Sequence, residues 1–591
     1  MKQLMLGNEA VARGLYEAGC SFVSSYPGTP STEITEYAAK YKEIYAEWAP
    51  NEKVAVEAAF GACVAGKRSF CSMKHVGLNV AADPVFTIAY TGVNAGMIIG
   101  VADDAGMHSS QNEQDNRWYS RLAKIPTFEP CDSQEAKDFV KKAFELSEKF
   151  DIPCLLHSVM RVSHCKSVVE LGPRDENTKV VERFPRNLPK YNCTAMYARV
   201  MHAKLEEKIK AIAEYAETCG IDRVEMHDTK MGIICTGVMY AYIKDVFPQA
   251  SVLKLGMSYP LPEKMIKDFA SKVDKLYVIE ELDPVIEEQV KSMGVDCVGK
   301  ELFPPCYELL PDRLLDICLE HGILKDDPRT MEVKPVEGLP GRNPVLCAGC
   351  PHRSTYFVLK KHDIACAGDI GCYNLGAQPP FEAQHTMGCM GASIGQLHGM
   401  SLANLPENRV CPIGDGTFWH SGLPALANMV HNNGRMIPCV LDNRITGMTG
   451  HQDNPATDYR VLRSVPATEI DIAGVCSAMG VKLVKTVNAF DVKEVEDGLK
   501  ECMAFDGVSV LITKGECVQF NKFSSTPYEV DSNKCIACQT CFKCGCPAIM
   551  VSDEENPKTH KKKCRIDPTL CNGCGICSQV CPVKAIAKKE D

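Results

Sequence analysis

The chain has 591 residues, of which 45% are hydrophobic and 24% are charged, and its net charge is −10. This length predicts several domains, and the negative charge argues against nucleic acid as a general partner. We expect a cytoplasmic protein without a membrane segment, because no apolar run is long enough to cross a bilayer and Glu9 and Arg13 interrupt any secretion signal. Cysteine is abundant, with 32 residues. In a large chain without an export signal, this abundance predicts metal binding rather than disulfides.

The first 165 residues alternate helical and strand patterns. Strands are expected at residues 21–25, 70–74 and 97–102, which predicts an α/β domain with a parallel sheet. Residues 166–195 are polar and rich in charged residues, so we expect them to form a connection rather than part of a core.

Two further α/β domains and a cysteine-rich tail are expected after this connection. Residues 196–330 begin with a charged helix and contain three strand patterns, which predicts a smaller α/β domain. A Pro- and Gly-rich linker at 333–344 separates it from a third α/β domain at 345–525. The tail, residues 530–591, has little apolar content, so bound clusters would have to help hold it together.

The tail contains two runs of closely spaced cysteines, each closed by a Cys-Pro pair. This spacing predicts two [4Fe-4S] clusters, with the last cysteine of each run binding the other cluster. The first ligand set is Cys535, Cys538, Cys541 and Cys581, and the second is Cys571, Cys574, Cys577 and Cys546. A zinc ribbon is the alternative, although zinc usually uses two CxxC pairs. Cys544 competes with Cys546, and Cys564 is left unassigned.

A second motif lies in the third domain, where Gly414-Asp415-Gly416 ends one strand pattern and Asn443 follows the next. Magnesium prefers oxygen ligands and shares them with phosphates, so Asp415 and Asn443 are the expected ligands at the ends of neighbouring strands. The glycines let a diphosphate approach the backbone, and the helix that follows favours its negative charge. The motif resembles the diphosphate-binding domain of thiamine diphosphate enzymes.

The resemblance to thiamine enzymes implies further site residues. The carbonyl of Ile445 becomes a third magnesium ligand, and Gly391 in MGCMGASIG lies in the cofactor-binding part of the domain. Such enzymes also need a glutamate that hydrogen-bonds the aminopyrimidine ring and promotes deprotonation of the thiazolium. Glu52, in the helix start NEKVAVEAAFG, matches it better than Glu57 does, and the alternative is that Glu52 is only a helix-start charge.

Together these features resemble the 2-oxoacid:ferredoxin oxidoreductases, and within them the alpha subunits of indolepyruvate ferredoxin oxidoreductase. The narrower match rests on YPGTPSTE (26–33), KHVGLNVAADP (74–84), DDAGMHSSQNEQD (103–115) and CAGCPHR (347–353). It implies four domains: a pyrimidine-type thiamine diphosphate domain (1–165), a transketolase C-terminal-like domain (196–330), a diphosphate-type domain (345–525) and a two-cluster ferredoxin domain (530–591).

The family resemblance also implies a reaction and its partners. An arylpyruvate is decarboxylated on thiamine diphosphate, two electrons leave one at a time through the clusters to ferredoxin, and coenzyme A takes the acyl group. Related single-chain enzymes have one more domain, so we expect a smaller beta subunit that forms a heterodimer or an α2β2 assembly. Cysteines at corresponding places in relatives hold another cluster, which implies a possible third [4Fe-4S] site made of Cys347, Cys350, Cys372 and Cys517, unless these are buried or zinc-bound thiols.

Substrate-side residues are less sharply indicated. Thr29 and Ser31 lie in the turn that approaches the cofactor in relatives. His75 and His108 follow strand patterns, where open α/β sheets place their ligands, so they are candidate catalytic residues, and His352 is a weaker one.

Three other functions are weighed against the oxidative reaction on arylpyruvates. A non-oxidative thiamine decarboxylase or carboligase would have no use for a ferredoxin tail. A non-catalytic electron-transfer module would have no use for Asp415, Asn443 and Glu52. The same reaction on pyruvate, a branched-chain 2-oxoacid or a phenylglyoxylate-type acid is compatible with all of these residues.

Overall fold

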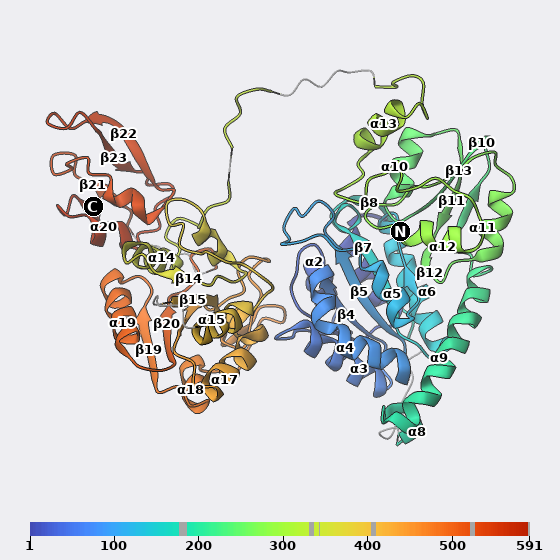
Figure 1. Cartoon of the computed structure of the whole chain (residues 1–591), viewed down its shortest axis with the longest axis horizontal. Helices are drawn as coiled ribbons and strands as arrows, with labels where there is room; N and C mark the ends of the chain where they lie inside the picture. The colour runs from blue at the N-terminus through green and yellow to red at the C-terminus, as the bar shows by residue number, and fades with distance from the viewer. Residues whose placement is uncertain (177–185, 330–335, 342, 404–408, 521–525, 589–591) are drawn as a thin grey trace. The chain divides into compact units, whose positions relative to one another are not determined.

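The computed structural model describes residues 1–176, 186–329, 336–341, 343–403, 409–520 and 526–588. Backbone contacts divide the chain into two compact units, 1–335 and 336–591 (Figure 1). The expected domain limits at residues 330 and 591, and the limit at 525, lie outside the described residues. None of the described helices combines the length and the apolar character needed to span a bilayer.

The first unit contains a seven-stranded sheet in the order β12-β6-β7-β5-β4-β2-β3. Its strands are β2 (Phe22–Ser25), β3 (Tyr45–Trp48), β4 (Ser69–Lys74), β5 (Met97–Asp103), β6 (Thr127–Phe128), β7 (Cys154–Val159) and β12 (Met257–Tyr259). All neighbouring pairs are parallel except β12 with β6. The strands expected at 21–25, 70–74 and 97–102 are confirmed as β2, β4 and β5. Every residue of β5 is buried, as expected for a central strand covered on both faces.

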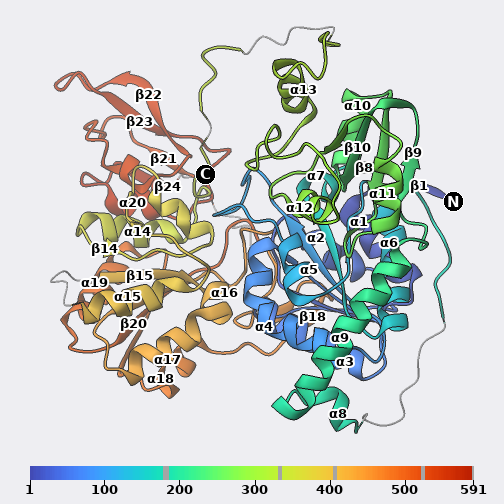
Figure 2. The same ribbon diagram turned by 45° about the vertical axis from the view of Figure 1, so that its right-hand side comes forward.

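Helices cover this sheet in pairs. Helix α1 (Gly7–Glu17) packs against α6 (Ser133–Phe150), and α3 (Glu52–Val64) packs against α4 (His75–Thr91). The long helix α9 (Ala195–Ala216) lies beside α4 (Figure 2). A further antiparallel pair, β1 (Lys2–Leu6) with β8 (Lys166–Glu170), includes part of the segment expected to be a connection.

A four-stranded sheet forms the other layer of the first unit. Its order is β13-β10-β11-β9, and its strands are β9 (Arg223–Glu225), β10 (Asp228–Thr236), β11 (Ala250–Leu255) and β13 (Leu276–Val278). Helices α10 (Met239–Val246), α11 (Glu263–Ala270), α12 (Val285–Ser292) and α13 (Pro311–Glu320) complete it. Two elements within 196–330 nevertheless join the first layer, because α9 places Leu205 and Ile212 in its core and β12 extends its sheet.

A buried ion cluster connects the two layers of the first unit. Arg117, which begins α5 (Arg117–Ala123), is 4% exposed. Its guanidinium pairs with Asp115 and donates to Glu280 Oε2 at 2.7 Å and to the Glu281 carbonyl at 2.8 Å. A guanidinium cannot be neutralised inside a protein, so these two carboxylates provide the charge compensation that its burial requires.

The second unit is built on a parallel sheet in the order β14-β15-β16-β20-β19. Its strands are β14 (Ala365–Cys366), β15 (Arg409–Gly414), β16 (Ile437–Asp442), β19 (Leu483–Asn488) and β20 (Ser509–Lys514). Helices α14 (His352–Lys361) and α19 (Val492–Ala504) pack together in one core. Helices α15 (Ala392–Leu402) and α17 (Leu423–His431) pack together in another. The strand patterns expected before Asp415 and Asn443 are confirmed as β15 and β16. Because β15, β16 and β20 are parallel, their carboxyl ends share one edge of the sheet.

The cysteine-rich tail packs on the same unit. It contains β21 (Tyr528–Val530) paired with β24 (Ile586–Lys588), β22 (Ile549–Glu555) paired with β23 (Lys562–Ile566), and helix α20 (Ile576–Val580). Gln579 joins it to the start of α19 by donating to the Phe490 carbonyl and accepting from the Val492 N–H, both at 2.8 Å. The buried part of its core consists of Cys541, Ile549 and Ile586, with further cysteines packed around them.

Candidate functional site

Three oxygen-bearing groups converge where β15 and β16 end. One terminal atom of the Asn443 amide lies 3.2 Å from Asp415 Oδ1 and 2.6 Å from the Ile445 carbonyl oxygen. If that atom is the amide oxygen, three oxygens face one another without a proton between them. Oxygens bound side by side to Mg²⁺ at about 2.0–2.1 Å are separated by about 3 Å, so this spacing suits the ion.

The other terminal atom of Asn443 decides which orientation is favoured. It lies 3.5 Å from His352 Nε2. The pKa of His352 is lowered to about 4 by burial and by neighbouring Arg353, so the ring is neutral and its Nε2 can accept a hydrogen bond when Nδ1 holds the proton. An amide NH2 directed at His352 leaves the Asn443 oxygen facing Asp415 and Ile445. The reverse orientation would instead let the NH2 group donate to both oxygens.

Asp415 is in an environment that disfavours its charge unless a cation is present. It is 2% exposed, and its pKa is raised to about 7 by burial and by the nearby Asp442 carboxylate. One side-chain donor compensates in part, because Asn454 Nδ2 donates to Asp415 Oδ2 at 3.0 Å. A divalent cation between Asp415 and Asn443 would remove the repulsion that raises this pKa.

Glycines at this edge are required by close packing. A Cβ atom at Gly414 would lie 2.7 Å from the Tyr373 ring, and one at Gly416 would lie 2.6 Å from Thr446 Oγ1. Gly391 begins α15 with φ of +84°, and its N–H donates to Asp369 Oδ1 at 2.7 Å. The Gly391 N–H is therefore already hydrogen-bonded to Asp369. The two glycines beside Asp415 have no side chains that would collide with neighbouring groups at this edge of the sheet.

Glu52 lies in the first unit, at the start of α3. It is 5% exposed, and Asn51 caps the helix by accepting from the Val54 N–H at 2.9 Å. The carboxylate lies against α4, where a Cβ atom added at Gly77 would be only 2.6 Å from Glu52 Oε1. Glu57 is exposed and pairs with Lys53 on the solvent side of the same helix. Of the two glutamates, only Glu52 is buried.

Lys74, at the end of β4, is a residue that the sequence analysis did not select. Its side chain packs against Gly28 in the turn before Thr29, and its Nζ donates to the Ser109 carbonyl at 3.2 Å. Burial lowers the pKa of Lys74, and the carboxylates of Asp104 and Glu52 oppose that shift. A partly buried ammonium beside the candidate catalytic glutamate could hold an anion. In the sequence, Lys74 opens the motif KHVGLNVAADP directly before His75, and this position could have indicated it as a candidate site residue.

The two candidate catalytic histidines are both engaged by protein groups. His75 is fully buried at the start of α4, and its Nε2 lies 3.1 Å from the Asn112 carbonyl oxygen. His108 Nε2 lies 2.9 Å from Glu308 Oε2, which connects its loop to the four-stranded layer. Thr29 is half-buried in the turn beside Lys74. Lys74 therefore lies next to the turn that contains Thr29 and within electrostatic reach of Glu52, whereas His108 faces a different partner.

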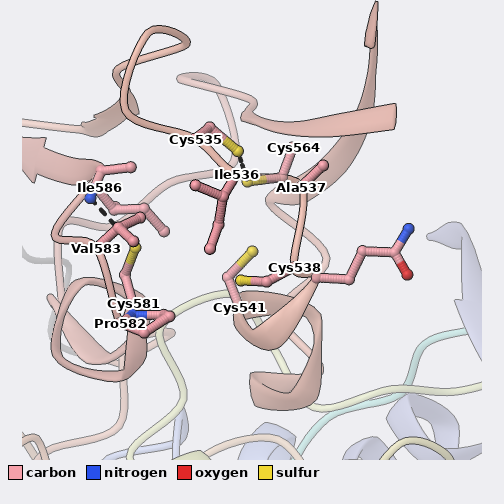
Figure 3. Close-up of a pocket in the computed structure, with 12 residues that line it drawn as sticks. Cys535, Ile536, Ala537, Cys538, Cys541, Cys564, Cys581, Pro582, Val583 and Ile586 are labelled. Atoms are coloured by element: carbon pink, nitrogen blue, oxygen red, sulfur yellow. Dashed lines mark hydrogen bonds between the residues drawn. The ribbon is translucent and has the colours of Figure 1, made fainter. Parts of the chain in front are cut away.

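We define the first tail quartet as Cys535, Cys538, Cys541 and Cys581. These four cysteines line one hollow of the tail (Figure 3). Cys564 lies in the same hollow, with its sulfur 3.9 Å from that of Cys535. The Ala585 N–H donates to Cys581 Sγ at 3.2 Å, a type of hydrogen bond that stabilises a cluster-bound thiolate.

We define the second tail quartet as Cys546, Cys571, Cys574 and Cys577. The pKa of Cys577 is raised by burial first and then by the charges of Cys574, Cys544, Cys546 and Cys571, so these sulfurs are close neighbours. The Tyr528 N–H donates to Cys571 Sγ at 3.4 Å. The buried Cys544 thus lies with this quartet, and the alternative between Cys544 and Cys546 stays open.

We define the loop quartet as Cys347, Cys350, Cys372 and Cys517. The pKa of Cys372 is raised to about 12 by burial and by the nearby Cys517 and Cys347, and that of Cys350 is raised to about 12 by burial, with Cys372 and Cys347 adding to the rise. The Cys517 N–H donates to the Asn443 carbonyl at 3.1 Å, which places this group beside the candidate magnesium ligands. Within the described residues, no three His, Cys, Asp or Glu side chains are close enough to hold a single metal ion.

Three family models match the chain. The model for the thiamine pyrophosphate enzyme C-terminal TPP-binding domain matches residues 369–513. The model for the thiamine diphosphate-binding part of pyruvate flavodoxin/ferredoxin oxidoreductase matches residues 13–223. A 4Fe-4S binding domain matches residues 565–587. These matches show thiamine diphosphate and iron–sulfur clusters as the cofactors.

Curated relatives match over the whole length. The chain is 39% identical to the indolepyruvate oxidoreductase subunit IorA of Pyrococcus horikoshii, covering 100% of this chain and 97% of the relative. It is also 39% identical to the IorA subunit of Archaeoglobus fulgidus, covering 99% and 97%. A 2-oxoglutarate:ferredoxin oxidoreductase structure from Magnetococcus marinus is 16% identical with a TM-score of 0.45, covering 54% of this chain and 65% of that chain.

The matched thiamine diphosphate and iron–sulfur domains agree with the names of the full-length relatives. The chain therefore belongs to the IorA family of indolepyruvate oxidoreductase subunits, within the 2-oxoacid:ferredoxin oxidoreductases.

Proposed function

We propose that this chain is the catalytic subunit for the oxidative decarboxylation of arylpyruvates such as indolepyruvate. A 2-oxoacid, coenzyme A and two oxidised ferredoxins give the acyl-CoA, CO2, two reduced ferredoxins and a proton. The observation that carries the proposal is the convergence of Asp415, Asn443 and the Ile445 carbonyl in the same unit as three cysteine groups. The preference for aryl substrates is supported by the names of the full-length relatives.

The proposed roles follow from the geometry. Asp415, Asn443 and the Ile445 carbonyl hold Mg²⁺ for the diphosphate, and His352 keeps the Asn443 oxygen facing the ion. Thiamine diphosphate supplies the carbanion chemistry, and Glu52 promotes its deprotonation from the pyrimidine side. Lys74 supplies a positive charge for the substrate carboxylate.

The three cysteine groups are proposed to bind one [4Fe-4S] cluster each. The loop quartet lies beside the magnesium ligands and receives electrons first, and the two tail quartets deliver them to ferredoxin one at a time. We expect the last cysteine of each tail run to bind the cluster of the other run. This is supported by Cys581, from the second run, which lines the hollow with Cys535, Cys538 and Cys541 of the first run.

Partners and the division into four domains are part of the proposal. A smaller beta subunit, in a heterodimer or an α2β2 assembly, would complete the sites for substrate and coenzyme A. The relatives' description as subunits supports this. The chain has 32 cysteines, of which twelve are assigned to the three cluster-binding quartets, and this supports a reducing compartment, the cytoplasm.

The overall activity is tested by anaerobic viologen reduction with a panel of 2-oxoacids, coenzyme A and the partner subunit. We expect kcat/KM to be highest for arylpyruvates and turnover to depend on coenzyme A. A preference for pyruvate or a branched-chain acid would contradict the substrate assignment. Release of CO2 without viologen reduction would instead indicate a non-oxidative decarboxylase.

The metal site is tested with Asp415→Ala and His352→Leu. Loss of an outer partner of a metal ligand typically weakens metal affinity by about 10- to 100-fold. We expect a loss in that range for His352→Leu and a larger loss for Asp415→Ala, measured as Mg²⁺-dependent binding of thiamine diphosphate by calorimetry. Iron content should stay unchanged. Asp497→Ala, at an exposed position on α19 of the same domain, is the control, and full cofactor binding by Asp415→Ala would refute the site.

The role of Glu52 is tested by hydrogen–deuterium exchange at the thiazolium carbon of bound cofactor. Glu52→Gln should keep the cofactor bound but slow exchange by ~10²–10⁴, the usual contribution of an acid–base group. Glu57→Gln removes the exposed glutamate of the same helix and should exchange at the wild-type rate. If the two variants exchange equally fast, Glu52 does not have this role.

The loop quartet is tested by iron analysis of Cys372→Ser. If three clusters are bound, this variant should lose one third of its iron and acid-labile sulfide while still binding thiamine diphosphate. Cys389→Ser, which replaces an exposed cysteine of the same domain, should lose none. Unchanged iron in Cys372→Ser would limit the chain to the two tail clusters.

A further inference from the structure

Arg353 is a buried cation between two of the cysteine groups. It is the second residue of α14 and is 1% exposed. On one side its Nε and Nη2 donate to the Cys347 carbonyl at 2.9 and 2.7 Å, and Nη2 also donates to the Leu346 carbonyl. On the other side its Nη1 donates to the Cys544 carbonyl at 3.0 Å. The guanidinium therefore bridges the loop quartet and the segment that leads into the second tail quartet.

This arginine has no carboxylate partner among the described residues, and all of its hydrogen bonds there end on backbone carbonyl oxygens. Arg117 in the first unit is similarly buried, yet it pairs with Asp115 and Glu280. A guanidinium cannot lose its proton in a protein, and an uncompensated buried charge is costly. The contrast indicates that Arg353 is compensated by negative charge that is not carried by a carboxylate.

Thiols are the groups around Arg353 that can carry this negative charge. The Arg353 N–H donates to the Cys350 carbonyl at 3.2 Å, while its side chain donates to the carbonyls of Cys347 and Cys544. These cysteines belong to, or lie with, two different groups. A [4Fe-4S] cluster with four thiolates formally has two net negative charges, and a third after it accepts an electron.

We propose that Arg353 is a positioning and charge-compensating residue shared by the cluster of the loop quartet and the cluster of the second tail quartet, and that it raises the reduction potential of both. The inference rests on the proposed function, because it requires these clusters. One electron from the decarboxylated 2-oxoacid enters the first cluster and passes to the second. Arg353 keeps all its protons, so no proton accompanies this transfer. Its fixed charge stabilises the additional negative charge at either position.

The proposal is tested by redox titration of the complete enzyme, monitored by electron paramagnetic resonance with dithionite as reductant. Arg353→Met keeps much of the side-chain volume and removes the charge. At a fixed potential we expect the ratio of reduced to oxidised cluster to fall about tenfold at both positions, which is about 59 mV for one electron. Arg353→Lys should restore most of this shift. The reduction potential of the cluster in the first tail quartet should be the same in Arg353→Met as in the wild type. The exposed control Arg435→Met should leave all the potentials unchanged.

If Arg353→Met loses iron, the comparison of Arg353→Gln with Arg353→Lys decides the question. Both variants lose the guanidinium fork, but only lysine keeps the charge. Lower potentials in the glutamine variant support charge compensation, and equal potentials mean that Arg353 only holds the loop. Unchanged potentials in an iron-replete Arg353→Met variant overturn this inference alone. A wild-type enzyme without iron–sulfur signals would overturn the proposed function as well.

Discussion

Parallel strands β15, β16 and β20 end at one edge of the sheet in the second unit, and the polar groups that follow them are buried there with few counter-ions. Burial and the nearby Asp442 carboxylate raise the pKa of Asp415, and the Asn443 amide lies between Asp415 Oδ1 and the Ile445 carbonyl oxygen. Buried acceptors that face one another with few donors are unfavourable by themselves and become favourable when a cation occupies the centre. The electrostatics of this edge of the sheet therefore favour binding of a cofactor through its metal ion.

The same reasoning applies to the thiols. Burial and repulsion from neighbouring cysteines raise the pKa of Cys372 in the loop quartet and of Cys577 in the second tail quartet, so the protein without metal would keep these two thiols protonated. Iron binding replaces the protons and supplies the cohesion that the small apolar core of the tail lacks. Arg353 fits this scheme, because its uncompensated charge and the charge of bound clusters would offset each other.

The first unit shows a different use of buried charge. Arg117 has its compensation in carboxylates and joins two layers, so its role is structural. Lys74 packs against Gly28 in the turn that precedes Thr29, and burial lowers its pKa while the nearby carboxylates of Asp104 and Glu52 oppose that shift. His108 was selected from its place after a strand, but in the structure it pairs with Glu308 from the other layer. Strand-end position alone does not distinguish a substrate-facing residue from one that joins two layers.

Much of this protein was determined by local sequence. Some strands of both large sheets, among them β2, β4, β5, β15 and β16, follow from local patterns of residues, because each pattern depends on residues a few positions apart. The metal motif of Asp415 and Asn443 and the two cysteine runs follow from spacing for the same reason. Long-range packing decided the rest. Helix α9 and strand β12 joined the first layer although they follow it in the chain, since edge pairing and core burial depend on which surface is available. Lys74 is important because folding buries it near Glu52, more than twenty residues away in the chain. Arg353 is important because folding buries it beside Cys544, almost two hundred residues away. Neither could be predicted from the sequence, because burial and electrostatic neighbours are properties of the tertiary structure.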